Sequence, residues 1–353
     1  MVTYIRPQPL RVIPRVSVVV PCYNYGHYLP EAVGSALEQP GVEVDVLIVD
    51  DASTDGSADV AHALAESDAR VRVIAHEENA GHIATYNEGL ASVDGDYLVL
   101  LSADDRLAPG ALGRATALME NRPDIAFTYG YAPTFTDETP VPQHRFAWWS
   151  VWSGEEWFRR LCERGTNVVC NPEVVMRRSV MRELGGYDAR LPHAADLHLW
   201  LRASQRGSVG RVNGDDQAFY RVHGDNMHLG FRSELLTDLC ERRLAFDQVL
   251  AEDAALLARH EDYAASARRA IARDALRRAA HAADLGGSLD GASVEEFMAV
   301  AVETWPDARR SWRWRAVDRR RSRGASPLRR LSAKSVRDLR GKTVWRRWRR
   351  FGT

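Results

Sequence analysis

Three segments of the sequence carry acidic or polar side chains directly after short runs of β-branched residues. They are Pro21 to Asn24, the pair Asp50-Asp51, and the pair Asp104-Asp105. One acidic pair alone is more often a helix cap or a turn. Two pairs held near one another repel, and they need a cation or a hydrogen-bonding ligand to compensate. Because carboxylate oxygens are the ligands that Mg²⁺ and Mn²⁺ prefer, these residues indicate a site for a hard divalent ion and its ligand.

The elements that must position these side chains alternate along the chain up to Tyr129. Each short apolar run is followed by a helical pattern, several with capping residues at the start. This alternation predicts βαβ units and a mostly parallel sheet, which is an α/β fold. Ligands bind at the carboxyl ends of such strands, so the polar segments would meet there. We expect strands at 16–20, 44–49, 72–75, 97–101 and 125–129, and helices at 29–38, 57–65, 83–91 and 109–120.

The middle of the chain has a different pattern. Residues 132–153 show no period and contain a tryptophan cluster, so we interpret them as a working loop or a crossover. Ser153 and Glu156 then form a capping box that opens a helix. Beyond it we expect strands at 171–176 and 217–222, a helix at 193–204, and an Ala- and Arg-rich helical region from 233 to about 302.

Composition excludes some classes. With 353 residues and 45% hydrophobic content, the chain can form one large domain with an appendage. The four cysteines form no CxxC pair, which argues against a disulfide framework or a zinc site and favours a reducing cytoplasm. No uncharged apolar run approaches the roughly 18 residues that a membrane span needs. From residue 307 on, the chain carries 18 Lys and Arg but only three Asp and Glu, which indicates a separate basic tail.

Four motifs resemble, in order and spacing, the family 2 glycosyltransferases of the GT-A fold. They are Val16 to Asn24, Val49 to Ser57, Asn79-Ala-Gly81 with Asn87-Glu-Gly89, and Leu101 to Asp105. The match is strong over residues 14–130 and weaker to about 228. It implies a Rossmann-like sheet flanked by helices and transfer of a sugar from a nucleotide sugar. We expect a GT-A domain at 1–230, a helical C-terminal region at 231–305 and an Arg/Trp-rich tail at 306–353.

The resemblance also implies roles in donor binding. In the family, the residues that match Tyr23 and Asp51 hold the nucleotide base, by stacking and by accepting an N–H bond. The Asp104-Asp105 pair matches the Asp-x-Asp-type site, although Ser102 stands where many members carry a further Asp. Because neighbouring strand-end side chains point opposite ways, we expect Asp105 to bind Mn²⁺ or Mg²⁺ and Asp104 to face the ribose or sugar. The other donor-binding candidates are Pro21, Asn24, Asn79, Gly81 and Asn87.

Catalysis is implied for the later segments. Ala195 to Arg202 resembles the family segment with the catalytic base, and Asp196 matches that base, whereas Ala195 stands where the family has Glu. The alternative is that Asp196 only caps a helix. His223 matches a histidine near the diphosphate or metal, although a lone histidine is often structural. A divalent ion would stabilise the leaving diphosphate while Asp196 takes the proton of the acceptor hydroxyl, and single displacement would invert the anomeric centre.

The expected partners follow from the same resemblance. The donor is a nucleotide sugar, with a UDP-sugar as the first candidate, and the acceptor is a glycan or a lipid-linked sugar of the cell surface. Trp148, Trp149 and Trp152 could stack on acceptor rings or fill the core. The tail interleaves arginines with tryptophans, which favours peripheral contact with the inner face of a membrane. Pairing with the chain's own acidic part is the alternative, and nucleic-acid binding is the weakest candidate.

Other functions fit the residues less well. A sugar-phosphate nucleotidyltransferase needs a Gly-rich loop with Arg and Lys after the first strand, and a dinucleotide-dependent oxidoreductase needs G-x-G-x-x-G there. The loop here is Pro-Cys-Tyr-Asn-Tyr-Gly. A catalytically inactive, nucleotide-sugar-binding scaffold of the same fold stays open as an alternative. The retained Asp51, Asp104, Asp105 and Asp196 argue against it.

Overall fold

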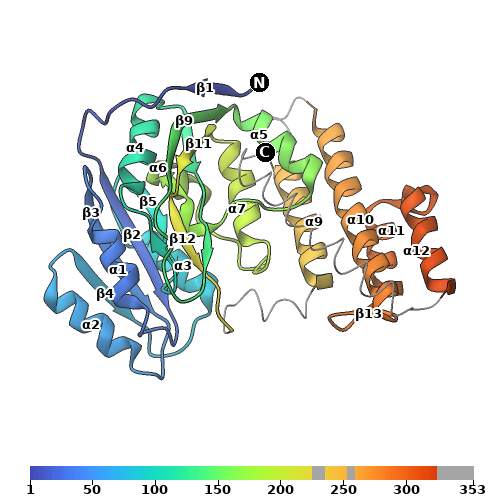
Figure 1. The fold of residues 1–353 in the computed structure, drawn as a ribbon, viewed down its shortest axis with the longest axis horizontal. Helices are drawn as coiled ribbons and strands as arrows, with labels where there is room; N and C mark the ends of the chain where they lie inside the picture. The colour runs from blue at the N-terminus through green and yellow to red at the C-terminus, as the bar shows by residue number, and fades with distance from the viewer. Residues whose placement is uncertain (225–234, 253–258, 324–353) are drawn as a thin grey trace. The chain divides into compact units, whose positions relative to one another are not determined.

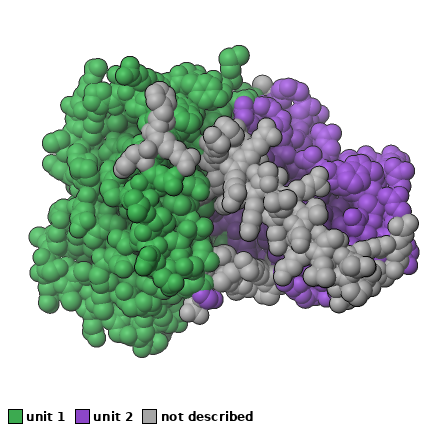
Figure 2. All heavy atoms as spheres, viewed as in Figure 1, with its two compact units in different colours: residues 1–157, 169–192, 202–223 green, residues 158–168, 193–201, 224–353 purple. Residues whose placement is uncertain are grey.

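A computed structural model gives the structure of the chain and describes residues 1–224, 235–252 and 259–323. These residues form two compact units, which are interleaved along the sequence. The first unit comprises residues 1–157, 169–192 and 202–223. The second comprises residues 158–168, 193–201 and the described residues from 224 on (Figure 2).

A large sheet forms the centre of the first unit (Figure 1). Its nine described strands have the order β1-β9-β11-β7-β10-β5-β2-β3-β4. β9 and β10 run against the other strands, which all point the same way, so the sheet is mostly parallel as predicted. The strands are β1 (Thr3–Ile5), β2 (Arg15–Cys22), β3 (Glu43–Asp50), β4 (Val71–Ala75), β5 (Tyr97–Leu100), β7 (Ile125–Tyr129), β9 (His144–Trp152), β10 (Val175–Arg177) and β11 (Ser208–Asp215).

The predicted βα units are confirmed. Helices α1 (Leu29–Leu37), α2 (Ser57–Ser67), α3 (His82–Ala91) and α4 (Ala111–Asn121) connect the parallel strands from β2 to β7. The helix ends differ from the prediction by one or two residues, and α4 begins at Ala111 rather than Pro109. Gly110 precedes it with a φ of 72°, a left-handed conformation that suits glycine and cannot be part of the helix. The remaining elements of this unit are α6 (Arg178–Leu184), the 3₁₀ turn η1 (Asn171–Glu173), and a small sheet of β6 (Arg106–Leu107), β12 (Ala218–Arg221) and β8 (Thr134–Phe135).

The interpretation of residues 132–153 as a working loop or a crossover without a regular pattern was wrong in large part. The segment contains β8 and the long strand β9, which pairs with β11 and β1. Trp149 and Trp152 are each 2% exposed, so these two side chains fill the core and are not available to stack on a sugar. The predicted strand at 171–176 is also divided: η1 occupies its first residues, where Pro172 lacks an N–H for a strand ladder, and β10 follows.

The second unit is helical. It contains α9 (Leu235–Glu252), α10 (His260–Leu285), α11 (Val294–Thr304), the 3₁₀ turn η4 (Pro306–Arg310) and α12 (Trp312–Arg323), with a short hairpin of β13 (Ser288–Leu289) and β14 (Ala292–Ser293) before α11. Helix α5 (Gly154–Arg164) and helix α7 (Ala195–Ser204) each contribute to both units. Ser293 begins α11 with a reciprocal capping box, in which Glu296 N–H donates to Ser293 Oγ at 3.2 Å. For the described residues between 235 and 302, the helical prediction is confirmed apart from the hairpin and the turns beside it.

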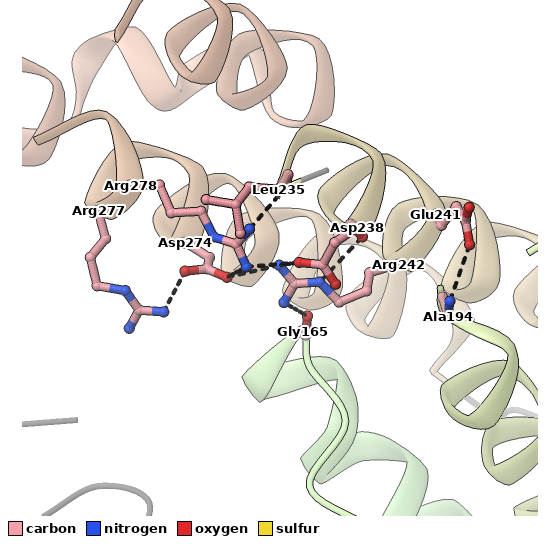
Figure 3. A network of polar contacts seen from close by, with 9 residues as sticks. All are labelled: Gly165, Ala194, Leu235, Asp238, Glu241, Arg242, Asp274, Arg277 and Arg278. Atoms are coloured by element: carbon pink, nitrogen blue, oxygen red, sulfur yellow. Dashed lines mark hydrogen bonds and ion pairs between the residues drawn. The ribbon is translucent and has the colours of Figure 1, made fainter. Parts of the chain in front are cut away.

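A buried ionic network joins the helices of the second unit (Figure 3). Arg242 on α9 lies 2.8 Å from Asp274 on α10 and donates to the carbonyl of Gly165 at 2.9 Å. Arg278 bridges back from α10 to Asp238 at 2.7 Å. Burial alone would raise the pKa of Asp274, but Arg242 and then Arg278 hold it well below the usual range. Two carboxylates and two guanidinium groups thus compensate one another in a largely buried network.

No helix in the described ranges is long and apolar enough to span a bilayer. The start of the basic tail folds as η4 and α12. The apolar positions from Leu328 to Trp348, on which an amphipathic tail helix would depend, lie outside the described residues.

Candidate active site

The first group of predicted residues surrounds Asp51, which follows β3. Asp51 Oδ1 accepts a hydrogen bond from Ala80 N–H at 2.7 Å, and Oδ2 accepts one from Gly81 N–H at 3.0 Å. Asn79 donates from its side chain to the Asp51 carbonyl at 3.0 Å. The structure therefore brings Asp51, Asn79 and Gly81 together at the carboxyl edge of the sheet.

A histidine that we did not predict completes this group. His76, directly after β4, has Nδ1 2.8 Å from Asp51 Oδ1 and Nε2 2.8 Å from Glu88 Oε2 on α3. Burial alone would raise the pKa of Asp51, but the bonds from His76, Ala80 and Gly81 bring it below its ordinary value. The bond to Asp51 in turn raises the pKa of His76, and Glu88 adds to the rise. The sequence did contain a signal for His76, because this residue directly follows a predicted strand and so lies at the same edge of the sheet as Asp51.

Two loops beside Asp51 are tied to each other. Asn24 lies after β2 with a left-handed φ of 59°; its N–H donates to Ser53 Oγ at 2.9 Å and its Oδ1 accepts from Thr54 N–H at 2.8 Å. Asn24 therefore connects the β2 loop to the β3 loop. The neighbouring Tyr23 is 49% exposed, so its side chain is accessible to a ligand. Pro21, the other candidate here, is part of β2 itself.

Asp104 and Asp105 follow β5 at the same edge, and they have different surroundings. Asp104 Oδ2 lies 3.0 Å from His223 Nε2. Asp105 is 1% exposed; its Oδ1 accepts from the backbone N–H of Arg221 at 2.9 Å. Burial, and next the charge of Asp104, raise the pKa of Asp105 well above its ordinary value. His223 therefore lies against Asp104, the carboxylate we predicted for the ribose, and not against Asp105.

Arg221, at the end of β12, organises this acidic pair and was not predicted. Its Nε donates to the carbonyl of Asp104 at 2.9 Å, and its guanidinium forms an ion pair with Glu31 on α1. The guanidinium carbon lies 4.6 Å from the ring centroid of Tyr28 and 4.4 Å from that of Phe135. Such stacking fixes the side chain, so Arg221 positions the backbone of the acidic loop. Its sequence signal was its place two residues before His223, the histidine that the family resemblance singles out.

Asn87, predicted as a donor-binding residue, has its amide engaged with another part of the first unit. Asn87 Nδ2 donates to the carbonyl of Tyr187 at 2.9 Å, and Asn87 Oδ1 accepts from Tyr187 N–H at 2.7 Å. A side chain at Gly186 would collide with Asn87 Oδ1. In this structure Asn87 therefore joins α3 to the Gly186-Tyr187 turn.

A divalent ion fits the acidic pair by its chemistry. Asp105 Oδ2 is buried without a hydrogen-bond partner among the described residues, and the adjacent Asp104 carboxylate adds a second hard oxygen donor. Two neighbouring carboxylates with little access to water gain from a cation. Within the described ranges, however, no three His, Cys, Asp or Glu residues gather closely enough to hold an ion. Diphosphate oxygens and water would have to supply the other ligands, as is usual for Mg²⁺.

Asp196 belongs to the second unit, in the first turn of α7. It is only half-buried, whereas the residues on either side, from Ala194 to Leu201, are buried. The amides before α7 are bound by Glu241 on α9, whose Oε2 accepts from His193 N–H at 2.8 Å. The same oxygen accepts from Ala194 N–H at 3.1 Å (Figure 3). A carboxylate from another helix therefore holds the two amides that directly precede α7.

The α/β fold and the acidic edge define the GT-A class of glycosyltransferases, and sequence comparison agrees. The family described as "Glycosyl transferase family 2" matches residues 17–185. A Bacillus subtilis protein named "Putative glycosyltransferase EpsE" is 30% identical over 217 residues, which cover 60% of this chain and 74% of that protein. The chain therefore belongs to glycosyl transferase family 2 and is a glycosyltransferase by class. It spans about half of another relative, the "Putative teichuronic acid biosynthesis glycosyltransferase TuaG" of Bacillus subtilis, which is 35% identical over 36% of this chain.

Solved structures support the same fold. Residues 1–349 of S. aureus TarS, in complex with UDP-GlcNAc, superpose with a TM-score of 0.54 at 15% identity, covering 85% of this chain and 92% of that one. The mannosyltransferase PcManGT of Pyrobaculum calidifontis, in complex with GDP-Man and Mn²⁺, gives a TM-score of 0.51 at 19% identity, with 95% and 89% covered. At this level of identity the likeness establishes the GT-A fold alone.

Proposed function

We propose that the chain transfers a sugar from a nucleoside-diphosphate sugar to an acceptor hydroxyl by a single, inverting displacement. The observation that carries this proposal is the convergence of Asp51, Asp104 and Asp105 on one edge of the sheet, from the ends of β3 and β5. The nucleotide sugars bound by the two solved neighbours support such a donor.

The base of the donor would contact Tyr23 and Asp51. Within the described ranges, Asp51 Oδ1 already accepts from His76 and Ala80, while Oδ2 accepts only from Gly81. A carboxylate oxygen can accept two hydrogen bonds, so one position on Oδ2 remains for an N–H of the base. Uracil offers one such N–H beside two carbonyls, which keeps a UDP-sugar as the first candidate. The exposed ring of Tyr23 offers a stacking surface.

Asp105 and Asp104 would hold Mn²⁺ or Mg²⁺, with His223 against Asp104. A bound ion would neutralise the charge that develops on the departing diphosphate. Arg221 holds the acidic loop at both its backbone and its carboxylate. These residues would therefore bind and orient the diphosphate end of the donor.

Asp196 would act as the base. Its carboxylate takes the proton of the acceptor hydroxyl while that oxygen forms a bond to the anomeric carbon and the bond from this carbon to the diphosphate oxygen breaks. Attack opposite the leaving group inverts the configuration. The acceptor we propose is a glycan or a lipid-linked sugar for a cell-surface polysaccharide or glycolipid, handled at the cytoplasmic face of a membrane.

Two measurements test this function. Thermal shift with a panel of nucleoside diphosphates and nucleotide sugars, with and without Mn²⁺, should give stabilisation that depends on the ion. Asp105→Ala should abolish that dependence, whereas Asp196→Asn should keep donor binding and lose donor turnover by about a hundredfold or more. Asp59→Asn, an exposed change on α2, is the matched control.

The inactive-scaffold alternative makes the opposite prediction. It requires donor binding without any turnover in the unaltered chain, so that Asp196→Asn changes nothing. If no nucleoside diphosphate stabilises the chain, both the transferase hypothesis and the scaffold hypothesis are overturned.

A further inference from the structure

The helical unit contains a cavity that plays no part in the proposed transfer. Its volume is about 470 Å³, and it opens between α10, the end of α11 and the start of α12. Its lining includes Arg269 and Arg273 from α10, Leu276 one turn further, and Trp305, Trp312 and Arg313. The volume lies within the range of small-molecule sites, roughly 300–1,000 Å³.

The arginines of the cavity differ from the other arginines of α10. Arg268, Arg277 and Arg278 each form an ion pair with an aspartate. Arg269 and Arg273, four residues apart and so on one face of the helix, form no ion pair within the described part of the chain. Arg273 donates only to the backbone carbonyl of Glu163, at 3.0 Å.

Arg313 adds a third guanidinium from α12. Its carbon lies 4.5 Å from the ring centroid of Trp312, and no carboxylate in the described ranges pairs with it. Burial, and then the charges of Arg273 and Arg277, lower the pKa of Arg313. The carboxylate that lines the cavity, Glu163, is paired with Arg159. Among the residues that the structure describes, the cavity thus gathers three cations without a matching anion.

We propose that this cavity binds a phosphate ester, with the phosphate among Arg269, Arg273 and Arg313 and the organic part against Trp305 and Leu276. Guanidinium groups match the geometry of phosphate oxygens, and their shared positive field is relieved by a dianion. Leu276 is buried and Trp305 half-buried, so they supply an apolar floor. The ligand chemistry is that of a phosphate on an apolar or ring-shaped group. It could come from an anionic lipid or from a soluble phosphate ester.

Calorimetry on the full chain with phenyl phosphate tests the soluble source, with inorganic phosphate for comparison. Sedimentation with vesicles of phosphatidylcholine and phosphatidylglycerol, against phosphatidylcholine alone, tests the lipid source. Arg269→Glu and Arg313→Glu should each weaken binding about tenfold or more in one of these arms, as expected for the loss of a charge-assisted contact. Binding of phenyl phosphate would identify a soluble phosphate ester as the ligand. If the two variants weaken only the binding of anionic vesicles, the ligand is a lipid headgroup.

The matched control is Arg315→Glu. Arg315 is exposed on the same helix as Arg313 and does not line the cavity, but its reversal changes the net charge equally. An equal loss in Arg315→Glu would overturn the proposal, because diffuse charge would then account for binding. So would an unaltered chain that binds neither phenyl phosphate nor anionic vesicles. Donor stabilisation should be the same in all three variants, which separates this test from that of the transferase function.

Discussion

His76 Nδ1 lies 2.8 Å from Asp51 Oδ1, while the other ring nitrogen of His76 lies 2.8 Å from Glu88 Oε2. A neutral imidazole can donate from only one nitrogen, so both contacts are hydrogen bonds only when the ring is protonated. The raised pKa of His76 and the lowered pKa of Asp51 agree with such an ion pair. The predicted base-binding carboxylate is therefore held by a cation that deprotonation would remove.

The first prediction concerns pH. Because the pKa of His76 is raised above 6.5 in the folded chain, its stabilisation is complete below that value and is lost as pH rises through the folded pKa. As the pH rises through the folded pKa, the free energy of unfolding should fall by about 1–2 kcal/mol, the scale of a charge-assisted hydrogen bond. The donor KM should increase over the same pH range. The lowered pKa of Asp51 contributes stability that is complete above pH 3.8 and is lost only as the pH falls below this value.

His76→Gln should remove most of this pH dependence. The matched control is His62→Gln, on the exposed side of α2, which should keep it. Thermal melts and donor KM between about pH 6 and 9 provide the measurement, around the ordinary pKa of histidine. Equal slopes in the unaltered chain and in His76→Gln would contradict the assignment.

The second prediction concerns the buried network of the helical unit. Arg242→Ala removes the most deeply buried partner of Asp274, and it should destabilise the chain by about 3–5 kcal/mol. Arg277 pairs with the same aspartate but its side chain is 76% exposed, so Arg277→Ala should cost about 1 kcal/mol or less. Urea unfolding followed by circular dichroism compares the two. A similar loss in both variants would show that burial does not decide the strength of these pairs.

The sequence predicted those parts of the fold whose signals are local. β2, α1, β3 and α2 follow from apolar runs and from capping residues, and Asp51 and Asp104 follow from strand ends. β11 was missed because its sequence is polar and Gly-rich although the strand is mostly buried. Arg211 Nη1 donates to Asn213 Oδ1 at 2.6 Å, which satisfies two polar groups inside the sheet. Only the partner strands make that segment a strand.

Long-range contacts explain what was missed in the site. Arg221 binds Asp104 across 117 residues, and Glu241 binds Ala194 across 47. In neither pair does the sequence around one residue predict its partner, so only the folded structure shows that the two residues are in contact. His76 is the exception, since its position directly after a predicted strand could have been used to predict it as a site residue.

The third prediction concerns Arg221. Arg221→Lys keeps a positive charge but loses the Nε bond to the Asp104 carbonyl and the planar stacking between Tyr28 and Phe135. We expect the donor KM to rise about tenfold with a smaller change in kcat. The change disturbs the orientation of the acidic loop, and so the binding of the donor, more than it disturbs the chemical step. Arg72→Lys, on the exposed part of β4, is the control. An unchanged donor KM would remove Arg221 from the site.

The last prediction concerns Glu241. Its carboxylate accepts two backbone N–H groups directly before α7, the helix that carries Asp196, and it stands near the position where Ala195 replaces the family's Glu. Glu241→Ala leaves these amides without their acceptor and lets the first turn of α7 move, so kcat should fall about tenfold while the donor KM stays constant. Glu241→Gln should recover much of the loss, because an amide oxygen still accepts. Glu261→Gln, in the exposed first turn of α10, is the control. If kcat is unchanged in Glu241→Ala, or if the donor KM rises in proportion, Glu241 does not position the base.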